Sequence, residues 1–191
     1  MSKSKGARPP HRPWEILESR EVYSAPPWLR VQVQRVRLPD GRTVEDFLQL
    51  QMVEYSLIVP RLEDGRLLLV RQYKHGPRRV GLYVPGGHLA PGETPLAAAQ
   101  RELLEETGCV SPQWRSLGSY TVSANQGSGC AHLFAADQTK RVAAPRSGDL
   151  EEMELVKLTT QEVADAVARG DVHCISAVGA LALALGPFFG G

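Results

Sequence analysis

The stretch from Gly87 to Cys109, GHLAPGETPLAAAQRELLEETGC, constrains this chain more than any other, because it specifies a helix and the charges that the helix carries. Thr94 is a good N-cap residue, and Pro95 stands at the first helical position, where its missing N–H costs nothing. A run of helix formers follows, and Gly108 is placed to end the helix at its C-terminus. We therefore predict a helix between Pro95 and Gly108.

Three carboxylates share one face of this predicted helix, because Glu102, Glu105 and Glu106 fall at positions i, i+3 and i+4. Like charges at these spacings destabilise an isolated helix by a few tenths of a kcal/mol per pair. A cluster of hard oxygen ligands is what a magnesium or manganese ion binds, and a solvated acidic face beside Arg101 is the alternative. A different face of the helix, which we expect to be buried, carries Leu96, Ala99, Leu103 and Thr107.

The longer spacing of this stretch favours the first interpretation. Gly87 is followed after five residues by Glu93 and after seven more by RELLEETG, residues 101–108. This pattern resembles the Nudix box of the Nudix hydrolase superfamily at every fixed position, and the resemblance covers about Glu54 to Leu158. Cys109 departs from the family, which usually carries an aliphatic residue there, and we expect it to be a small buried side chain.

The resemblance implies Mg²⁺-dependent hydrolysis of a nucleoside diphosphate linked to another moiety, with Mn²⁺ as the alternative ion. Water must attack phosphorus while the negative oxygens are screened, and metal ions serve both needs. Glu102, Glu105 and Glu106 match the family's metal-ligand positions, and the carbonyl of Gly87 or Gly86 would add another ligand. Arg101 is expected to orient these carboxylates and to pair with Glu93. The candidate catalytic residues of the helix are therefore Arg101, Glu105 and Glu106.

Two further segments resemble the ADP-ribose and nucleotide-sugar pyrophosphatase branch of the superfamily. They are Arg71-Gln72-Tyr73-Lys74 before the box, and the strands predicted ahead of the core, which in that branch contribute to a homodimer. The segment 123–129 and His132-Leu133-Phe134 stand where the branch has a Ser-Pro-Gly turn and a His-x-Phe strand. Ala124 or Asn125 replaces the proline of that turn, and Pro85-Gly86-Gly87 replaces Pro-Ala-Gly. Other sugar nucleotides therefore stay open as substrates beside ADP-ribose.

The candidate substrate-binding residues are Trp28, Arg71 and Asn125. Trp28 would stack on a base or pack at a strand start, and Arg71 would hold the diphosphate or lie on a strand surface. A base that activates water is expected from the acidic loop before the last strand, where the branch brings a glutamate over the site. Glu151 and Glu152 are the candidates, as a base or as a fourth metal-ligating carboxylate, and an exposed acidic loop is the alternative.

Two other functions remain as alternatives. The first is another Nudix activity, on nucleoside triphosphates or dinucleotides, although a minimal triphosphatase would begin close to Glu54. The second is a non-catalytic nucleotide-binding module, whose sequence sign would be loss of box carboxylates, and none is lost here.

Composition limits the class of partner and the compartment. The 191 residues carry a formal net charge of +1, which argues against a dedicated nucleic-acid binder. The most apolar stretch, from Ile175 to Leu185, is too short to cross a membrane, and no apolar signal segment follows Met1. Cys109, Cys130 and Cys174 are odd in number and widely spaced, as is typical of reduced thiols. We expect a cytoplasmic protein whose ligand is a small nucleotide.

The order of the predicted elements indicates the fold class. Residues 28–38 and 44–51 alternate apolar and polar side chains around an Asp-Gly turn, which predicts a β-hairpin. Further strands are predicted at 54–62, 66–73, 114–122, 131–135 and 154–158, an exposed loop at 137–149, and helices at about 159–170 and 176–185. We expect a flexible arm over 1–27, a dimerising β extension over 28–51, and a Nudix domain over 52–187. That domain would be an α/β/α sandwich around a mixed sheet.

Overall fold

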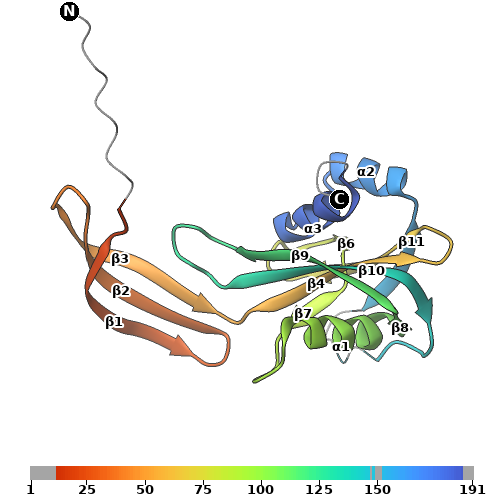
Figure 1. The fold of residues 1–191 in the computed structure, drawn as a ribbon, viewed down its shortest axis with the longest axis horizontal. Coiled ribbons are helices and arrows are strands. Elements are labelled where there is room, and N and C mark those ends of the chain that lie inside the picture. Colours follow the sequence, from red (N-terminus) through yellow and green to blue (C-terminus); the bar gives the residue numbers. More distant parts are fainter. Residues whose placement is uncertain (1–11, 147, 149–151, 187–191) are drawn as a thin grey trace, which may run out of the picture. The chain divides into compact units, whose positions relative to one another are not determined.

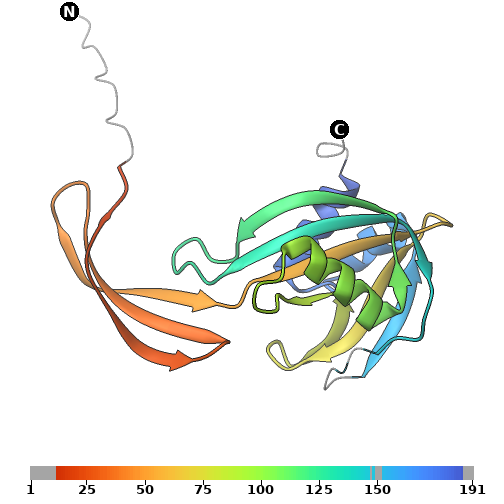
Figure 2. The same cartoon turned by 60° about the horizontal axis from the view of Figure 1, so that its bottom comes forward.

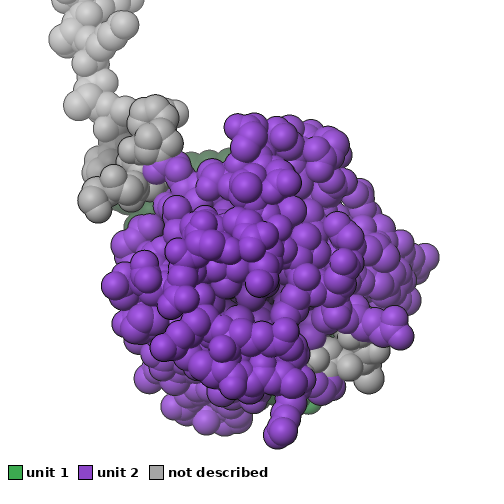
Figure 3. Space-filling model, turned by 90° about the vertical axis from the view of Figure 1, so that its right-hand side faces the viewer, with its two compact units in different colours: residues 1–52, 123–128 green, residues 53–122, 129–191 purple. Residues whose placement is uncertain are grey.

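The computed structural model describes residues 12–146, 148 and 152–186, which form eleven strands and three helices (Figure 1). The chain divides into two compact units (Figure 3). Unit 1 is Met1–Met52 with Ser123–Ser128, and unit 2 is Val53–Val122 with Gly129–Gly191. The expected boundary after residue 51 lies one residue from this division. The loop 123–128 groups with unit 1, where the Leu50 N–H donates to the Gln126 carbonyl at 2.8 Å.

Unit 1 contains an antiparallel sheet of three strands, in the order β1-β2-β3, where a two-stranded hairpin was expected. Its strands are β1 (Glu15–Ala25), β2 (Leu29–Arg37) and β3 (Thr43–Met52). Residues 15–25, expected within a flexible arm, therefore form a strand, and residues 1–11 lie outside the described part of the chain. Nine of the eleven β1 residues are exposed. The strand therefore has no buried face that alternating apolar residues in the sequence could indicate. Pairing with β2, from Glu15↔Arg37 to Ala25↔Leu29, holds it in place.

Unit 2 is built on a mixed sheet, as predicted, and this sheet has eight strands. The path runs β11-β5-β4-β10-β8, and β6, β7 and β9 pair with β5, β4 and β10 respectively. Strands β10 and β4 are parallel, and the other pairs are antiparallel. The strands are β4 (Tyr55–Leu62), β5 (Leu67–Lys74), β6 (Arg79–Tyr83), β7 (Gly86–His88), β8 (Cys109–Val110), β9 (Gln113–Thr121), β10 (Cys130–Arg141) and β11 (Met153–Leu158).

Strands β4 and β5 pair only next to their turn, at Arg61↔Leu67. Beyond that point β5 pairs with β6, and β4 pairs with the short strand β7. The run 67–70 is buried, with no residue more than 1% exposed, so β5 is the central strand that its apolar sequence predicts. The divergence of β4 and β5 brings Gly86 and Gly87 beside the start of β4, at Leu57 and Ser56.

Helices cover both faces of this sheet, which confirms the α/β/α sandwich (Figure 2). On one face Ala99 and Leu103 of α1 (Pro95–Thr107) pack with Ile58, Leu68 and Phe134. On the other face α2 (Thr160–Ala168) and α3 (Ile175–Leu185) pack against a larger apolar cluster that includes Val59, Leu69 and Leu133. Alternation along the strands separates the two clusters. A capping box formed by Thr159 and Glu162 begins α2, where a helix was predicted.

Two local expectations were wrong. Leu96, expected on the buried face of α1, is 39% exposed. The segment 137–149 was expected to be a loop, but β10 continues to Arg141 because Lys140 and Arg141 pair with Val110 and Cys109 of β8. No helix among the described residues is long and apolar enough to cross a membrane.

Candidate active site

The capped helix α1 positions the candidate catalytic side chains. Its N-terminus is fixed by the Thr94 hydroxyl, which accepts from the Ala97 N–H at 3.3 Å, and by Ser56 of β4, whose hydroxyl donates to the Pro95 carbonyl at 2.8 Å. Its C-terminus ends at Gly108, whose φ is +69° and whose N–H donates to the Leu104 carbonyl. The predicted caps are thus confirmed, and the helix is held at both ends.

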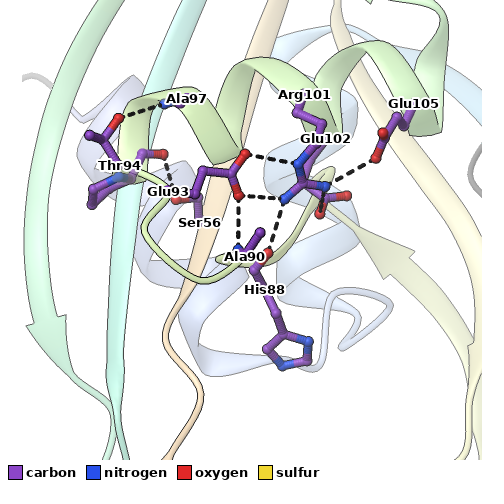
Figure 4. Close-up of polar contacts among 10 residues, drawn as sticks. Ser56, His88, Ala90, Glu93, Thr94, Ala97, Arg101, Glu102 and Glu105 are labelled. Atoms are coloured by element: carbon purple, nitrogen blue, oxygen red, sulfur yellow. Dashed lines mark hydrogen bonds and ion pairs between the residues drawn. The ribbon is translucent and has the colours of Figure 1, made fainter. Parts of the chain in front are cut away.

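Arg101 lies at the centre of the polar contacts on α1 (Figure 4). Its Nε and Nη2 donate to the two carboxylate oxygens of Glu93, each at 2.9 Å, which confirms the predicted pair. Nη1 donates to Glu102 at 2.6 Å and to Glu105 at 3.0 Å. Nη2 also donates to the His88 carbonyl at 3.0 Å, so one guanidinium joins the helix to the loop that precedes it.

These contacts change the acidity of the groups that they join. The Arg101 guanidinium, followed by the Ala90 N–H, lowers the pKa of Glu93 to about 2. The hydrogen bonds that Arg101 donates, first to Glu93 and then to Glu102 and Glu105, raise the pKa of Arg101 above its ordinary value. Burial, with a smaller effect from Lys74, lowers the pKa of His88. At neutral pH Arg101 and Glu93 therefore form a fully charged pair.

Gly86 and Gly87 allow the backbone to approach the helix glutamates closely. The Gly86 N–H donates to Oε2 of the buried Glu106 at 2.8 Å. A Cβ atom on Gly87 would overlap the Glu102 carboxylate, and one on Gly86 would overlap the Ser56 carbonyl. Glycine is therefore required at both positions for the carboxylates of α1 to lie against this turn.

The donor set at this turn suits a divalent cation. Glu102, Glu105 and Glu106 are hard oxygen ligands, and the space beside Gly87 that a side chain would fill holds the Glu102 carboxylate instead. Among the described residues no three acidic, histidine or cysteine side chains converge as a metal cage does. Arg101 binds Glu102 and Glu105, and the Gly86 N–H binds Glu106. The residues thus fit a hard cation chemically.

The segment after β10 is fixed to the end of α1. The N–H groups of Val142 and Ala143 donate to the Gly108 carbonyl, and the Arg146 N–H donates to the Glu105 carbonyl at 2.6 Å. The segment then leads toward the two glutamates proposed as bases. Glu151 lies outside the described residues, and Glu152 is exposed immediately before β11.

Two of the candidate residues line one cavity of about 560 Å³, at the end of β5 and the start of β11. These residues are Arg71 and Glu152. Arg71 forms an ion pair with Glu154 at 3.0 Å, and the two side chains are 47% and 64% exposed. The described residues that line the cavity are Arg71, Gln72, Tyr73, Val80, Glu152, Met153 and Glu154. Sequence reasoning did not single out Gln72 or Glu154, because only their register with Met153 and Arg71 places them at this cavity.

Trp28 and Asn125 both belong to unit 1. Trp28 is 58% exposed, and its N–H donates to the Ala25 carbonyl in the turn between β1 and β2. Asn125 is exposed in the loop 123–128, where the Ser123 hydroxyl donates to Gln126 at 2.8 Å. In unit 2, His132 forms hydrogen bonds with Ser119 at 2.7 Å and Glu54 at 2.8 Å.

Comparison with protein families identifies two segments. The model described as NUDIX domain matches residues 53–173, more than half of the chain. The model described as nucleoside diphosphate sugar hydrolase N-terminal domain matches residues 14–47, which include β1, β2 and the first half of β3.

Individual proteins resemble this chain over most of its length. An ADP-ribose pyrophosphatase from Bacillus subtilis is 26% identical over 145 residues, 74% of this chain and 76% of that protein. A methanol dehydrogenase activator from Bacillus methanolicus is 30% identical over 138 residues, 70% of this chain and 72% of that protein. The crystal structure of an ADP compounds hydrolase superposes with a TM-score of 0.78 at 22% identity, over 91% of this chain and 93% of that chain. This last likeness establishes the fold.

Proposed function

The chain belongs to the Nudix family of hydrolases, and on that premise we propose that it hydrolyses the pyrophosphate bond of ADP-ribose or a related nucleotide sugar. The products would be a nucleoside monophosphate and a sugar phosphate. The observation that carries this proposal is the set of charges on α1, in which Arg101 contacts Glu93, Glu102 and Glu105 beside the Gly86-Gly87 turn. A module that had lost catalysis would not be expected to keep this set complete.

The N-terminal segment supports a sugar-linked substrate. Residues 14–47 match a domain described from nucleoside diphosphate sugar hydrolases, and one relative of this chain is an ADP-ribose pyrophosphatase. Trp28, in the same unit, would stack on the base, and Asn125 would contact the nucleotide.

Nudix hydrolases generally use divalent metal ions, and we propose Mg²⁺, with Mn²⁺ as the alternative. Glu102, Glu105, Glu106 and the Gly87 carbonyl would hold the ion. A divalent cation bound there would screen the diphosphate oxygens and make water a better nucleophile. Arg101 would orient Glu102 and Glu105, which it already contacts at 2.6 and 3.0 Å.

The remaining roles fall to the residues around the cavity at β5 and β11. Arg71 would donate to the diphosphate, since its fork of N–H groups suits phosphate oxygens and its present partner, Glu154, is exposed. Glu152 would accept the proton of the attacking water, or serve as a fourth carboxylate for the ion. Glu151 remains the second candidate for this role.

A substrate panel tests the proposed function. The purified chain is supplied with MgCl₂ and, separately, ADP-ribose, other nucleotide sugars, a dinucleotide and nucleoside triphosphates, and phosphate is measured after a coupled phosphatase step. We expect the highest kcat/KM with a nucleotide sugar. Preference for a triphosphate or dinucleotide would reassign the substrate, and no turnover of any compound would favour a nucleotide-binding module.

A further inference from the structure

A second cavity, of about 500 Å³, lies on the α1 face of the sheet of unit 2, at the C-terminal end of the helix. Its apolar floor consists of Leu62 of β4, Leu68 of β5 and Leu155 of β11, which all pack with the cluster beneath α1. Thr107 and Cys109 border the cavity on the side of the helix. None of the described residues that we assign to hydrolysis lines it, so this cavity is separate from the proposed active site.

The register of the strands shows which side chains project into this space. Lys157 is opposite Leu68 in the β11–β5 pair, and Arg141 is opposite Cys109 in the β10–β8 pair. Opposite residues of a pair project from the same face of a sheet, and Leu68 and Cys109 both belong to the cluster beneath α1. The exposed side chains of Arg141 and Lys157 therefore project from the α1 face. They lie on two sides of the floor, because β5 and β4 separate their strands.

Three basic side chains line the cavity, and the protein does not balance their charges. They are Lys140, Arg141 and Lys157, and none of them forms an ion pair with a described residue. Arg141 donates from its Nε to the Ala143 carbonyl at 3.0 Å, which leaves its terminal guanidinium nitrogens for a ligand. Like charges gathered without a counter-ion repel one another, so the arrangement favours an anion between them.

The two acidic side chains that line the cavity do not cancel this charge. Asp64 is held by Arg66, which donates to its Oδ2 from Nε at 3.0 Å and from Nη2 at 2.6 Å. That pair is neutral, which leaves Glu63 as the one carboxylate of the cavity without an ion-pair partner among the described residues. The unpaired side chains around the cavity therefore carry three positive charges and one negative charge.

The dipole of α1 explains only part of this arrangement. The last turn of α1 has no basic residue, and Arg141, opposite Cys109, can balance the partial negative charge at that end. Lys157 does not serve this purpose, because β5 and β4 lie between its strand and β10, and the effect of a helix dipole is confined to the last turn. A ligand that extends across the apolar floor explains both basic side chains.

We propose that this cavity binds an organic phosphate whose apolar part lies on the leucine floor. Arg141 holds the phosphate through its fork of N–H groups, and Lys157 and Lys140 add compact positive charges. The floor packs against a ring or a short chain of the ligand, and the volume is within the range of about 300–1,000 Å³ that is typical of small-molecule sites. This inference does not depend on the proposed function.

An NMR titration of the ¹⁵N-labelled chain with three probes tests the site. The buffer contains EDTA, so that no divalent ion draws phosphate to the glutamates of α1. The probes are phenyl phosphate, inorganic phosphate and benzyl alcohol, which carry both parts of the proposed ligand, only the anion, or only the ring. We expect phenyl phosphate to bind at least about tenfold more tightly than either other probe, because it uses the charges and the floor together. The amide signals that shift should belong to residues 62–68, 139–141 and 155–157.

Two charge changes of opposite sign test the electrostatic part. Lys157→Gln removes an attractive charge and should raise the Kd of phenyl phosphate at least about fivefold. Glu63→Gln removes the repulsive charge and should lower that Kd at least about twofold. Arg115→Gln is the control, since Arg115 is an exposed arginine of β9 that does not line the cavity, and its Kd should stay within about twofold of the wild type.

Three results would overturn the inference. The first is an unchanged Kd in both Lys157→Gln and Glu63→Gln. The second is a set of shifted amides that lies in unit 1 or around the α1 glutamates instead of the cavity. The third is equal binding of phenyl phosphate and benzyl alcohol, which would mean that the cavity does not recognise phosphate. None of these results bears on hydrolysis, because the substituted residues lie outside the proposed active site.

Discussion

At the scale of single residues, Arg101 determines how the acidic side chains of α1 are arranged. It forms hydrogen bonds to three carboxylates and to the His88 carbonyl, and its own side chain is one-third exposed. Of these carboxylates Glu93 accepts the most hydrogen bonds, because Arg101 donates to both of its oxygens and the Ala90 N–H adds a third bond. Glu93 therefore stabilises the loop between β7 and α1.

The pH dependence of stability tests the contribution of Glu93. Its folded-state pKa is about 2, below the ordinary value of 4.5, so its stabilising effect is present above pH 4.5 and is lost as the pH falls toward 2. We expect Glu93→Gln to lower the free energy of unfolding by about 1.5–3 kcal/mol at pH 7, toward the lower value because solvent reaches Arg101. Urea unfolding at a series of pH values should show that the difference in unfolding free energy between the wild type and Glu93→Gln disappears between pH 4.5 and 2. A gap independent of pH would contradict this account.

The residues of α1 were predictable because the pattern of the box is local and complete. The sequence predicts the Thr94 cap, the shared face of the glutamates and the Arg101–Glu93 pair, all within fifteen residues. Gln72 and the contacts of His132 were not predictable in this way. Their surroundings depend on strands that are adjacent only in the folded sheet, such as β5 with β11 and β10 with β9.

At the scale of elements, the C-terminus of α1 is the point where the helix meets the segment that leads to Glu152. Gly108 adopts φ +69°, and a Cβ atom there would overlap the carbonyl of Ala143. The Gly108 carbonyl in turn accepts from Val142 and Ala143. The sequence predicts that glycine ends the helix. The contact with residues 142–143 depends on β10 extending to Arg141, and because the last residues of this strand are polar, the sequence does not predict that extension.

A matched pair of glycine substitutions tests this junction. Gly108→Ala and Gly65→Ala both place alanine at a positive φ, which costs roughly 1–2 kcal/mol. Gly65, in the turn between β4 and β5, has φ +84° and open space around it, whereas Gly108 faces backbone. We expect Gly108→Ala to be less stable than Gly65→Ala by at least about 1 kcal/mol in urea unfolding. Equal losses would mean that residues 142–143 do not pack on the helix end as described.

At the scale of the whole molecule, unit 1 carries an unusual amount of exposed apolar surface for a three-stranded sheet. Seven of its large apolar side chains are at least 43% exposed. They are Trp14, Ile16, Val22, Tyr23, Trp28, Leu48 and Met52. A small sheet needs a packing partner to be stable, and a second copy of the chain is the partner that we propose. The sequence predicted two of these strands from their alternation and missed β1, whose charged residues are mostly exposed.

Light scattering on the full chain tests the dimer. At micromolar concentration we expect a mass of twice the 20.9 kDa chain. Ile16→Lys, on the exposed strand β1, should shift the mass toward that of the monomer, because a charge would then lie on the apolar surface. Val142→Lys is the control, since Val142 is similarly exposed in unit 2, and it should remain dimeric. A monomeric wild type would contradict the proposal.

The central claim is that the glutamates of α1 support catalysis through a divalent ion, and Glu106→Gln tests it most directly. The glutamine oxygen can still accept from the Gly86 N–H, and one of three neighbouring like charges is removed, so the fold should be kept. Steady-state kinetics on the best substrate of the panel, at saturating Mg²⁺, should show kcat lowered at least about a hundredfold, because charge stabilisation acts mainly in the transition state. Glu63→Gln, in an exposed turn, should match the wild type. Near wild-type kcat in a folded Glu106→Gln would contradict the account.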